Sequence, residues 1–172
     1  MARGADLHIV PLAAVHDRGG FTCGIETLDR YLRTQAGQDV RRKANAVFIL
    51  AAIDAPEIVL GYYTLCATAL RQGEVPEPAR RHIPRYPLVS ATLIGRLAVA
   101  HGQQGRKFGS ILLADALQRA LASADAVGSS MVVVDALDER AAGFYTAHAF
   151  LRLPDSLRLI LPMRTVSGAS GQ

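Results

Sequence analysis

The segment from residue 95 to residue 110 has the residue types and spacing of an anion-binding loop. Residues 95–99 end a predicted strand, the loop 103–109 contains two glycines, and a helix is predicted to begin at Ser110. Such a loop exposes unpaired backbone N–H groups, and the helix N-terminus adds the positive end of a dipole. This combination suits a pyrophosphate group. An ordinary glycine turn between a strand and a helix fits the same residues, so the pattern alone leaves both interpretations open.

The second candidate for chemistry is Tyr145, which follows Phe144 near the end of a helix predicted over residues 138–147. A tyrosine hydroxyl can serve as a general acid, a role that typically contributes about 10²–10⁴-fold to a rate. The alternative is an aromatic residue that only packs its helix. No residue stands out as a general base. Asp135 ends a predicted strand and is a candidate, with a solvated helix cap as the competing interpretation.

The basic residues are the third candidate, because arginine offers a planar fork that suits phosphate. Of the 19 basic residues only Lys43 and Lys107 are lysines, and the others are arginines. A GC-rich genome would also explain the number of arginines, so their positions are more informative. Two groups stand out, and a solvated charged face is the alternative interpretation of each. They are Arg41, Arg42 and Lys43, and Arg80, Arg81 and Arg85.

The hydrophobic pattern predicts a framework of alternating strands and helices for these candidates. Residues 110–124 have apolar side chains at helical spacing, whereas 46–53 and 58–65 are apolar runs of strand length around a turn. The remaining predicted strands are 7–9, 91–99, 131–134, 150–153 and 157–161, and the remaining predicted helices are 25–32, 36–43 and 138–147. This order predicts an α/β domain with a mixed sheet whose faces are covered by helices. The Pro- and Arg-rich segment 71–87 is expected to be irregular.

Composition limits the classes of protein to consider. The chain has 172 residues, 50% of them hydrophobic, and a formal net charge of +4, which together exclude intrinsic disorder. We expect a single domain over residues 1–165 and a flexible, Gly/Ser-rich tail over 166–172. No uncharged apolar stretch reaches the roughly 18 residues of a membrane span. Cys23 and Cys66 stand alone, so we expect buried structural thiols, no metal and a cytoplasmic protein.

Gln104 and Gly109 lie where motif A of the GNAT superfamily of N-acetyltransferases has its first and last fixed residues, so this segment resembles that motif. The family's loop reads Gln/Arg-x-x-Gly-x-Gly/Ala and binds the pyrophosphate of acetyl-CoA. Lys107 departs from the pattern, since the family has glycine there. The resemblance therefore implies either a backbone at Lys107 without positive φ or a strained one. The lysine would also add positive charge near the phosphates.

The resemblance extends over roughly residues 6 to 164 and narrows to one subgroup. The chain is similar to the toxin acetyltransferases of type II toxin–antitoxin pairs in several segments that occur in the same order. These segments are 21–24, 28–32, 61–65, 95–99, 134–136, 142–145 and 161–163. Several matching segments in order are a stronger signal than one glycine loop.

For the fold, the resemblance implies a GNAT-like α/β structure with a mixed, mostly antiparallel central sheet flanked by helices. For the cofactor, it implies acetyl-CoA as acetyl donor, with Leu97, Ala98 and Val99 pairing with the pantetheine arm. The residues implied to hold the pyrophosphate are Gln104, Gly105, Arg106, Lys107, Phe108, Gly109 and Ser110. Phe144 is implied to contact the cofactor as well. The amine is implied to attack the thioester directly, with Tyr145 as the general acid that protonates the leaving thiolate.

For the substrate, the resemblance implies acetylation of the α-amine of aminoacyl-tRNA, which blocks translation. A charged tRNA presents phosphates, so a basic surface is needed to bind it. The residues expected to contact it are Arg41, Arg42, Lys43, Arg80, Arg81 and Arg85. The subgroup is neutralised by ribbon-helix-helix antitoxins, so such a partner is implied, and homodimers are common in the family.

Two alternatives remain open at the level of sequence. The first is an acetyltransferase that acts on a small amine or on a protein N-terminus, for which the basic groups would be dispensable. The second is a binding module without catalysis that keeps acetyl-CoA as a ligand, an alternative that Lys107 supports. A DNA-binding role for the chain alone has less support, since no helix-turn-helix or zinc spacing occurs.

Overall fold

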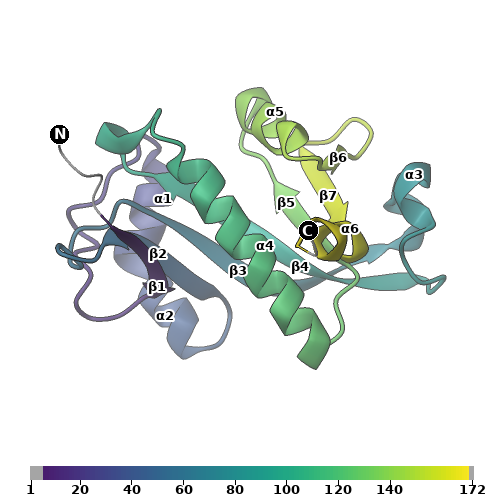
Figure 1. Cartoon of the computed structure of the whole chain (residues 1–172), viewed down its shortest axis with the longest axis horizontal. Coiled ribbons are helices and arrows are strands. Elements are labelled where there is room, and N and C mark those ends of the chain that lie inside the picture. Colours follow the sequence, from purple (N-terminus) through teal and green to yellow (C-terminus); the bar gives the residue numbers. More distant parts are fainter. Residues whose placement is uncertain (1–5, 171–172) are drawn as a thin grey trace. The chain divides into compact units, whose positions relative to one another are not determined.

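The computed structural model describes residues 6–170, which contain one sheet of seven strands (Figure 1). The strand order is β1-β2-β3-β4-β5-β7-β6. The strands are β1 (Leu7–Pro11), β2 (Ala46–Ala52), β3 (Gly61–Arg71), β4 (Leu88–Val99), β5 (Met131–Asp135), β6 (Leu151–Arg152) and β7 (Arg158–Pro162). β4 and β5 pair in parallel, whereas β1–β2, β2–β3, β5–β7 and β6–β7 pair antiparallel. The expected mixed, mostly antiparallel sheet is therefore confirmed.

Helices connect the strands and flank the sheet. They are α1 (Glu26–Arg30), the π-helix η1 (Tyr31–Gln35), α2 (Ala36–Arg41), α3 (Glu77–Arg80), α4 (Phe108–Ala126), α5 (Glu139–Ala147) and α6 (Met163–Ser170), with short 3₁₀ helices η2 (Gln72–Glu74) and η3 (His101–Gln103). Within residues 6–170, no helix is long and apolar enough to span a bilayer.

The described residues form two compact units. The first comprises residues 6–65 and 96–115, and the second comprises residues 66–95 and 116–170. β3, β4 and α4 each contribute residues to both units. The single domain that we expect over residues 1–165 stays a prediction.

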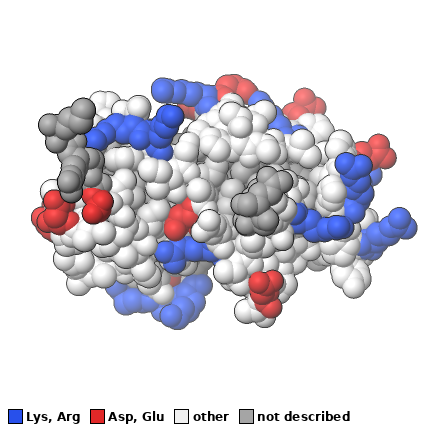
Figure 2. Space-filling view, in the orientation of Figure 1, with Lys and Arg blue, Asp and Glu red and all other residues white. Residues whose placement is uncertain are grey.

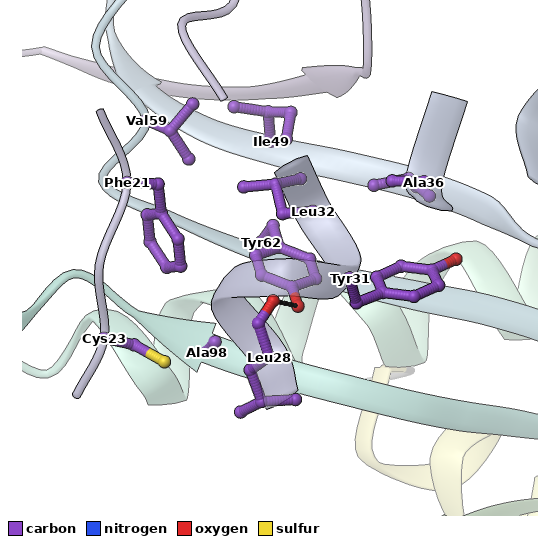
Figure 3. Close-up of a cluster of buried hydrophobic side chains, with 11 residues drawn as sticks. Phe21, Cys23, Leu28, Tyr31, Leu32, Ala36, Ile49, Val59, Tyr62 and Ala98 are labelled. Atoms are coloured by element: carbon purple, nitrogen blue, oxygen red, sulfur yellow. Dashed lines mark hydrogen bonds between the residues drawn. The ribbon is translucent and has the colours of Figure 1, made fainter. Parts of the chain in front are cut away.

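The core of the first unit is organised by β3, whose neighbouring residues point to opposite faces. Tyr62 faces the helix α1, and its hydroxyl donates to the Leu28 carbonyl at 2.7 Å. Tyr63 faces α4, and its hydroxyl donates to the Asp115 carboxylate at 2.6 Å. Figure 3 shows the Tyr62 ring among the buried side chains of this core, with its bond to Leu28 dashed. The polar ends of both buried tyrosines are thus satisfied, one by each covering helix.

β3 and β4 approach each other closely at Gly61. A Cβ atom added there would lie 2.9 Å from the Ala98 carbonyl oxygen and 2.9 Å from a methyl carbon of Leu112. A larger residue would therefore push either β4 or α4 away. The Ala100 N–H donates to the Leu60 carbonyl at 2.8 Å, which fixes the end of β4 on the β3 side.

The core of the second unit is built around β5. Residues 131–134 of this strand are completely buried, so the strand needs apolar residues on both faces and shows no alternation. Other buried side chains of this core come from β4, β7 and the segment that follows β3. They include Val75, Ala79, Ile83, Val89, Ala91 and Ile160.

Most predicted elements are confirmed with shifted ends, and two segments differ in type. The segment 71–87, expected to be irregular, includes η2 and α3. Residues 166–170, expected in a flexible tail, lie in α6, because Met163 and Val166 are buried one turn apart and anchor a helix there. Residues 171 and 172 of the predicted tail lie outside the described residues. β3 also runs on to Arg71, six residues beyond its predicted end, since Leu70 joins the second core.

Candidate active site

The loop between β4 and α4 contains two residues in the left-handed region of φ. Gly105 has a φ of +86° and Lys107 has a φ of +64°. Backbone N–H groups in turns with such residues converge into concave nests that bind anions. Lys107 thus keeps a conformation that favours glycine, which is the strained one of the two alternatives left by the sequence. A left-handed residue other than glycine costs roughly 1–2 kcal/mol.

Side chains add positive charge around this loop. Lys107 is exposed, and its ammonium forms no hydrogen bond or ion pair with any residue from 6 to 170. Arg106 donates to the Gln103 side-chain oxygen at 2.7 Å, and its guanidinium carbon lies 5.4 Å from the ring centroid of Phe108. Phe108 is buried at the first turn of α4 and anchors the loop to the core. An anion in the loop would therefore meet two cations as well as backbone N–H groups.

Gln104 fastens this loop to the rest of the first unit. Its side-chain nitrogen donates to the Cys23 carbonyl at 3.0 Å and to the Val99 carbonyl at 3.3 Å. Both N–H groups of the Gln104 side-chain amide therefore donate to carbonyls of the protein. Gly109 and Ser110 follow in the first turn of α4 and are half-buried.

A buried carboxylate holds the segment to which Gln104 is attached. Asp29 is only 5% exposed, and its oxygens accept from the Cys23 N–H at 2.8 Å and the Thr22 hydroxyl at 3.0 Å. The Thr22 carbonyl in turn accepts from the His101 N–H at 2.8 Å. The anion loop is therefore positioned by a chain of hydrogen bonds that begins in α1. Thr22, Cys23 and Asp29 lie in the segments 21–24 and 28–32 that resemble the toxin subgroup, but the resemblance alone assigned them no role in the site.

The end of β4 lies beyond its pairing with β5. The parallel ladder runs from Ala91 to Ile94 on β4 and stops there. Leu97, Ala98 and Val99 come after the last ladder pair, so their backbone groups on that edge are not used by the ladder. The pairing with a pantetheine arm that the resemblance implies for these residues would use this edge of β4.

Tyr145 lies in α5 within the second unit. Asp138 caps this helix by accepting from the Ala141 N–H at 2.8 Å. Tyr145 is 7% exposed and makes edge contacts with Phe144 and Phe150 at ring-centroid distances of 5.1 and 5.6 Å. Burial raises the pKa of Tyr145 from its ordinary value of 10 to about 12, so its hydroxyl is protonated at neutral pH.

Two other candidate groups have structural partners. Asp135 accepts two hydrogen bonds from the Arg158 guanidinium at 2.7 and 2.9 Å. It therefore caps no helix, and the cap of α5 is Asp138 instead. Cys23 is buried as expected, and burial raises its pKa to about 11, whereas Cys66 is only partly buried, since it lies in a less covered part of β3. Among residues 6–170, no three His, Cys, Asp or Glu side chains gather as a metal site requires.

The first basic group lies at the end of α2 in the first unit. Arg41, Arg42 and Lys43 are all exposed, and Lys43 has a φ of +61°. Figure 2 shows basic side chains in several separate groups on one face, with acidic side chains among them. Local position rather than total charge therefore decides which arginines are suited to RNA.

The second basic group lies beside α3 in the second unit. Arg80 donates to the Val75 carbonyl at 2.8 Å and to the Gly73 carbonyl at 3.2 Å, so its guanidinium is engaged within its own segment. Arg80, Arg81 and Arg85 line a hollow of about 870 Å³. Arg81 and Arg85 are exposed, which leaves them suited to an external anion.

The comparisons with curated proteins point to one family. No protein-family model matches the chain. The chain is 33% identical over 156 residues to a protein of Mycobacterium tuberculosis (strain ATCC 25618 / H37Rv) named tRNA-acetylating toxin, with 90% of this chain and 91% of that protein covered. It is 28% identical over 164 residues to a protein of Sinorhizobium fredii (strain NBRC 101917 / NGR234) named probable toxin TacT, with 91% and 90% covered.

Solved structures of similar sequence share the fold. AtaT complexed with acetyl-methionyl-tRNAfMet is 30% identical, with a TM-score of 0.87 over 96% of this chain and 99% of that chain. A tyrosine-to-phenylalanine variant of AtaT, bound to the C-terminus of the antitoxin AtaR and to acetyl-CoA, is 29% identical, with a TM-score of 0.83 over 97% and 99%. From the agreement of sequence and fold over nine-tenths of the chain, it follows that this protein belongs to the family of tRNA-acetylating toxins, which are GNAT-type acetyltransferases.

Proposed function

We propose that this protein transfers the acetyl group of acetyl-CoA to the α-amine of the amino acid on charged tRNA, and so blocks translation as the toxin of a type II toxin–antitoxin pair. The observation that carries the proposal is the loop after β4, where Gly105 and Lys107 have the left-handed backbone of an anion-binding turn. A relative named tRNA-acetylating toxin and a structure of AtaT with acetyl-methionyl-tRNAfMet support it.

The end of β4 is the proposed place of the pantetheine arm. Leu97, Ala98 and Val99 lie beyond the β4–β5 ladder, so backbone groups on that edge are available for pairing with amides of the arm. Gly61 fixes this stretch from the other edge, because β3 approaches so closely there. Phe144 is assigned to the cofactor by the resemblance.

The loop is the proposed place of the pyrophosphate. Backbone N–H groups of residues 105–110 bind it, and Arg106 and Lys107 add positive charge. Gln104 serves this site as a positioning residue, because its amide holds the loop against the Cys23 carbonyl. Phe108 keeps the first turn of α4 in place from the core side.

Tyr145 is the proposed general acid. Bound acetyl-CoA supplies an activated thioester. As the amine nitrogen forms its bond to the acetyl carbon and the C–S bond breaks, the Tyr145 hydroxyl gives its proton to the departing thiolate. The surplus proton on the acetylated nitrogen passes to water, and the Tyr145 phenolate regains a proton from water. The hydroxyl is protonated at the start of each turnover, since the pKa of Tyr145 lies at about 12.

The exposed basic residues are the proposed contacts to the RNA backbone. Arg41, Arg42 and Lys43 offer a compact group beside α2. Arg81 and Arg85 offer exposed guanidinium groups at the hollow beside α3, with only the Nε–H of Arg81 engaged within residues 6–170, at 3.3 Å from the His82 Nε2. Arg80 contributes less because its N–H groups bind backbone carbonyls. Contacts of this kind read the backbone rather than the bases.

The proposed partner is a ribbon-helix-helix antitoxin. AtaT was solved with the C-terminus of its antitoxin AtaR. A structure named the KacTA–DNA complex, 26% identical to this chain with a TM-score of 0.78, supports an antitoxin that binds DNA. We extend the proposal to a homodimer and to the cytoplasm, where charged tRNA is found. Gel filtration with the product of the neighbouring gene tests the partnership, and its failure to co-elute would contradict it.

The substrate is tested with labelled acetyl-CoA and purified protein. We expect label on charged tRNA, no label on the same tRNA after deacylation, and no label on small amines or peptide N-termini. Label on small amines or peptides but not on tRNA would establish the alternative substrate class. Binding of acetyl-CoA without transfer to any acceptor would establish the binding-module alternative.

A further inference from the structure

Arg96 lies on β4 directly before the strand segment proposed for the pantetheine arm. Its guanidinium carbon is 3.6 Å from the ring centroid of Tyr31, which is a close cation–π contact. Arg96 and Ala98 share a face of β4, since they are two residues apart, and Ala98 belongs to the core around Tyr62. The guanidinium therefore lies on the face of the sheet that carries α1 and η1.

The N–H donors of Arg96 are open. Among residues 6–170, no side chain or carbonyl forms a hydrogen bond or ion pair with this partly buried guanidinium. The hydrogen bond from Gln35 is the main cause that lowers the pKa of Asp39, and the charge of Arg96 adds to it. The Asp39 oxygens already accept from the side chains of Tyr31, Gln35 and Asn45 at 2.8, 2.9 and 3.0 Å. Stacking occupies the face of the guanidinium and leaves the donors in its plane free. A partly buried cation without a hydrogen-bond partner is costly, so an external partner is expected.

Tyr31 holds Arg96 in one orientation. It begins the π-helix η1, a rare element that is frequent at functional sites. Its ring is buried and stacks on Tyr62 at a centroid distance of 6.4 Å, and its hydroxyl donates to Asp39 (Figure 3 shows the ring in the core). Neither end of this side chain is free to move. The stacked guanidinium is therefore preorganised to receive a planar or tetrahedral anion.

We propose that Arg96 binds a phosphate of the acceptor end of the charged RNA. This inference rests on the proposed function. The reacting amine sits on an amino acid attached to the terminal ribose, so the nearest RNA phosphate lies within one nucleotide of it. Arg96 precedes Val99 by three residues, about 10 Å along a strand and away from the pyrophosphate loop. A phosphate held by the open fork of Arg96 would place the amine beside the cofactor strand.

The test compares Arg96→Gln and Arg96→Lys with the wild type, and Arg33→Gln is the matched control. Arg33 lies in the π-helix η1, which also contains Tyr31, and its guanidinium is already paired with the Glu26 carboxylate at 3.4 Å. We expect Arg96→Gln to raise the KM for charged tRNA about tenfold or more and to leave the KM for acetyl-CoA unchanged. The plot of log affinity for charged tRNA against log salt should become shallower by about 0.7, the value for one phosphate of a single strand.

The conservative variant separates a binding role from a structural one. Arg96→Lys keeps the positive charge but loses the planar set of guanidinium N–H donors. We therefore expect it to retain most of the dependence of log affinity on log salt, while the KM for charged tRNA still rises. Arg33→Gln should change neither quantity. An unchanged KM and salt slope in both Arg96 variants would overturn the inference while leaving the proposed function intact. A wild type that does not acetylate charged tRNA would instead remove the proposed function itself.

Discussion

Lys107 occupies a left-handed position, with a φ of +64°, at a place where the acetyltransferase motif has glycine. Its exposed ammonium has no partner among residues 6–170, so the strain is not offset by a contact within the described chain. A charge beside a pyrophosphate would offset it only when acetyl-CoA is bound. Lys107 is thus expected to lower the free energy of unfolding and to raise the affinity for acetyl-CoA.

The Lys107→Gly variant tests both expectations, for stability and for acetyl-CoA affinity. Glycine removes roughly 1–2 kcal/mol of left-handed strain but adds about 0.5–1 kcal/mol of backbone entropy loss, so the free energy of unfolding should rise by about 0–1.5 kcal/mol. The dissociation constant for acetyl-CoA should rise several-fold at low salt and less at high salt, because exposed charges are screened. Calorimetric titration at two salt concentrations measures this. Equal affinity in both proteins at low salt would show that Lys107 only fits the turn.

At the scale of elements, the position of the anion loop depends on α1 as much as on β4 and α4. Asp29 holds Thr22 and Cys23, and Gln104 binds the Cys23 carbonyl from the loop. Gln104 and Cys23 are 81 residues apart, so this link exists only in the folded chain. Loss of the Asp29 carboxylate would leave the buried Cys23 N–H without its acceptor and loosen the attachment of the loop.

Asp29→Ala should therefore affect both stability and cofactor binding. We expect the free energy of unfolding to fall by about 3 kcal/mol, since two hydrogen bonds to a buried charged group are lost. The dissociation constant for acetyl-CoA should rise at a temperature where the variant remains folded. Asp17→Ala is the control, because Asp17 also accepts a backbone N–H, that of Gly20 at 3.1 Å, in an exposed turn of the same unit. An Asp29 variant that binds acetyl-CoA with wild-type affinity would disprove the positioning role.

The elements that sequence periodicity predicted well are those whose burial is regular. The hairpin of β2 and β3, the long helix α4 and the fully apolar β5 all occur as expected. Three features of the site depend on contacts between distant residues and could not be predicted from local pattern. These are the buried acceptor Asp29, the end of the β4–β5 ladder at Ile94, and the cation–π contact of Arg96. The helix α6 was not predicted, because the Gly- and Ser-rich composition of this segment indicates a loop. Its helix depends on two buried side chains, those of Met163 and Val166.

At the scale of the whole molecule, the basic groups on the protein surface distinguish the proposed RNA substrate from the alternative substrates. A formal net charge of +4 is modest, and Figure 2 shows acidic groups among the basic ones, so RNA binding depends on local groups. A small amine or a peptide N-terminus needs no basic surface, whereas an RNA backbone does.

The double variant Arg41→Glu/Arg42→Glu tests the first basic group. Lys43 is left unchanged, because its φ of +61° makes any substitution there a change in backbone strain as well. We expect the KM for charged tRNA to rise at least tenfold at about 0.15 M salt, with a shallower salt dependence and an unchanged affinity for acetyl-CoA. Arg30→Glu/Arg164→Glu makes the same change in net charge at exposed arginines outside the proposed surface and serves as the control. Equal effects of the two double variants would mean that only net charge matters.

The proposed reaction is tested most directly by the single-turnover rate of acetyl transfer to charged tRNA in wild type and Tyr145→Phe. Phenylalanine fills the same buried site, where the hydroxyl has no hydrogen-bond partner among residues 6–170, so folding and acetyl-CoA affinity should be kept. We predict that the rate falls about 10²–10⁴-fold, the usual contribution of a general acid, while the dissociation constant for acetyl-CoA is unchanged. A Tyr145→Phe protein that transfers acetyl to charged tRNA at the wild-type rate would contradict the account.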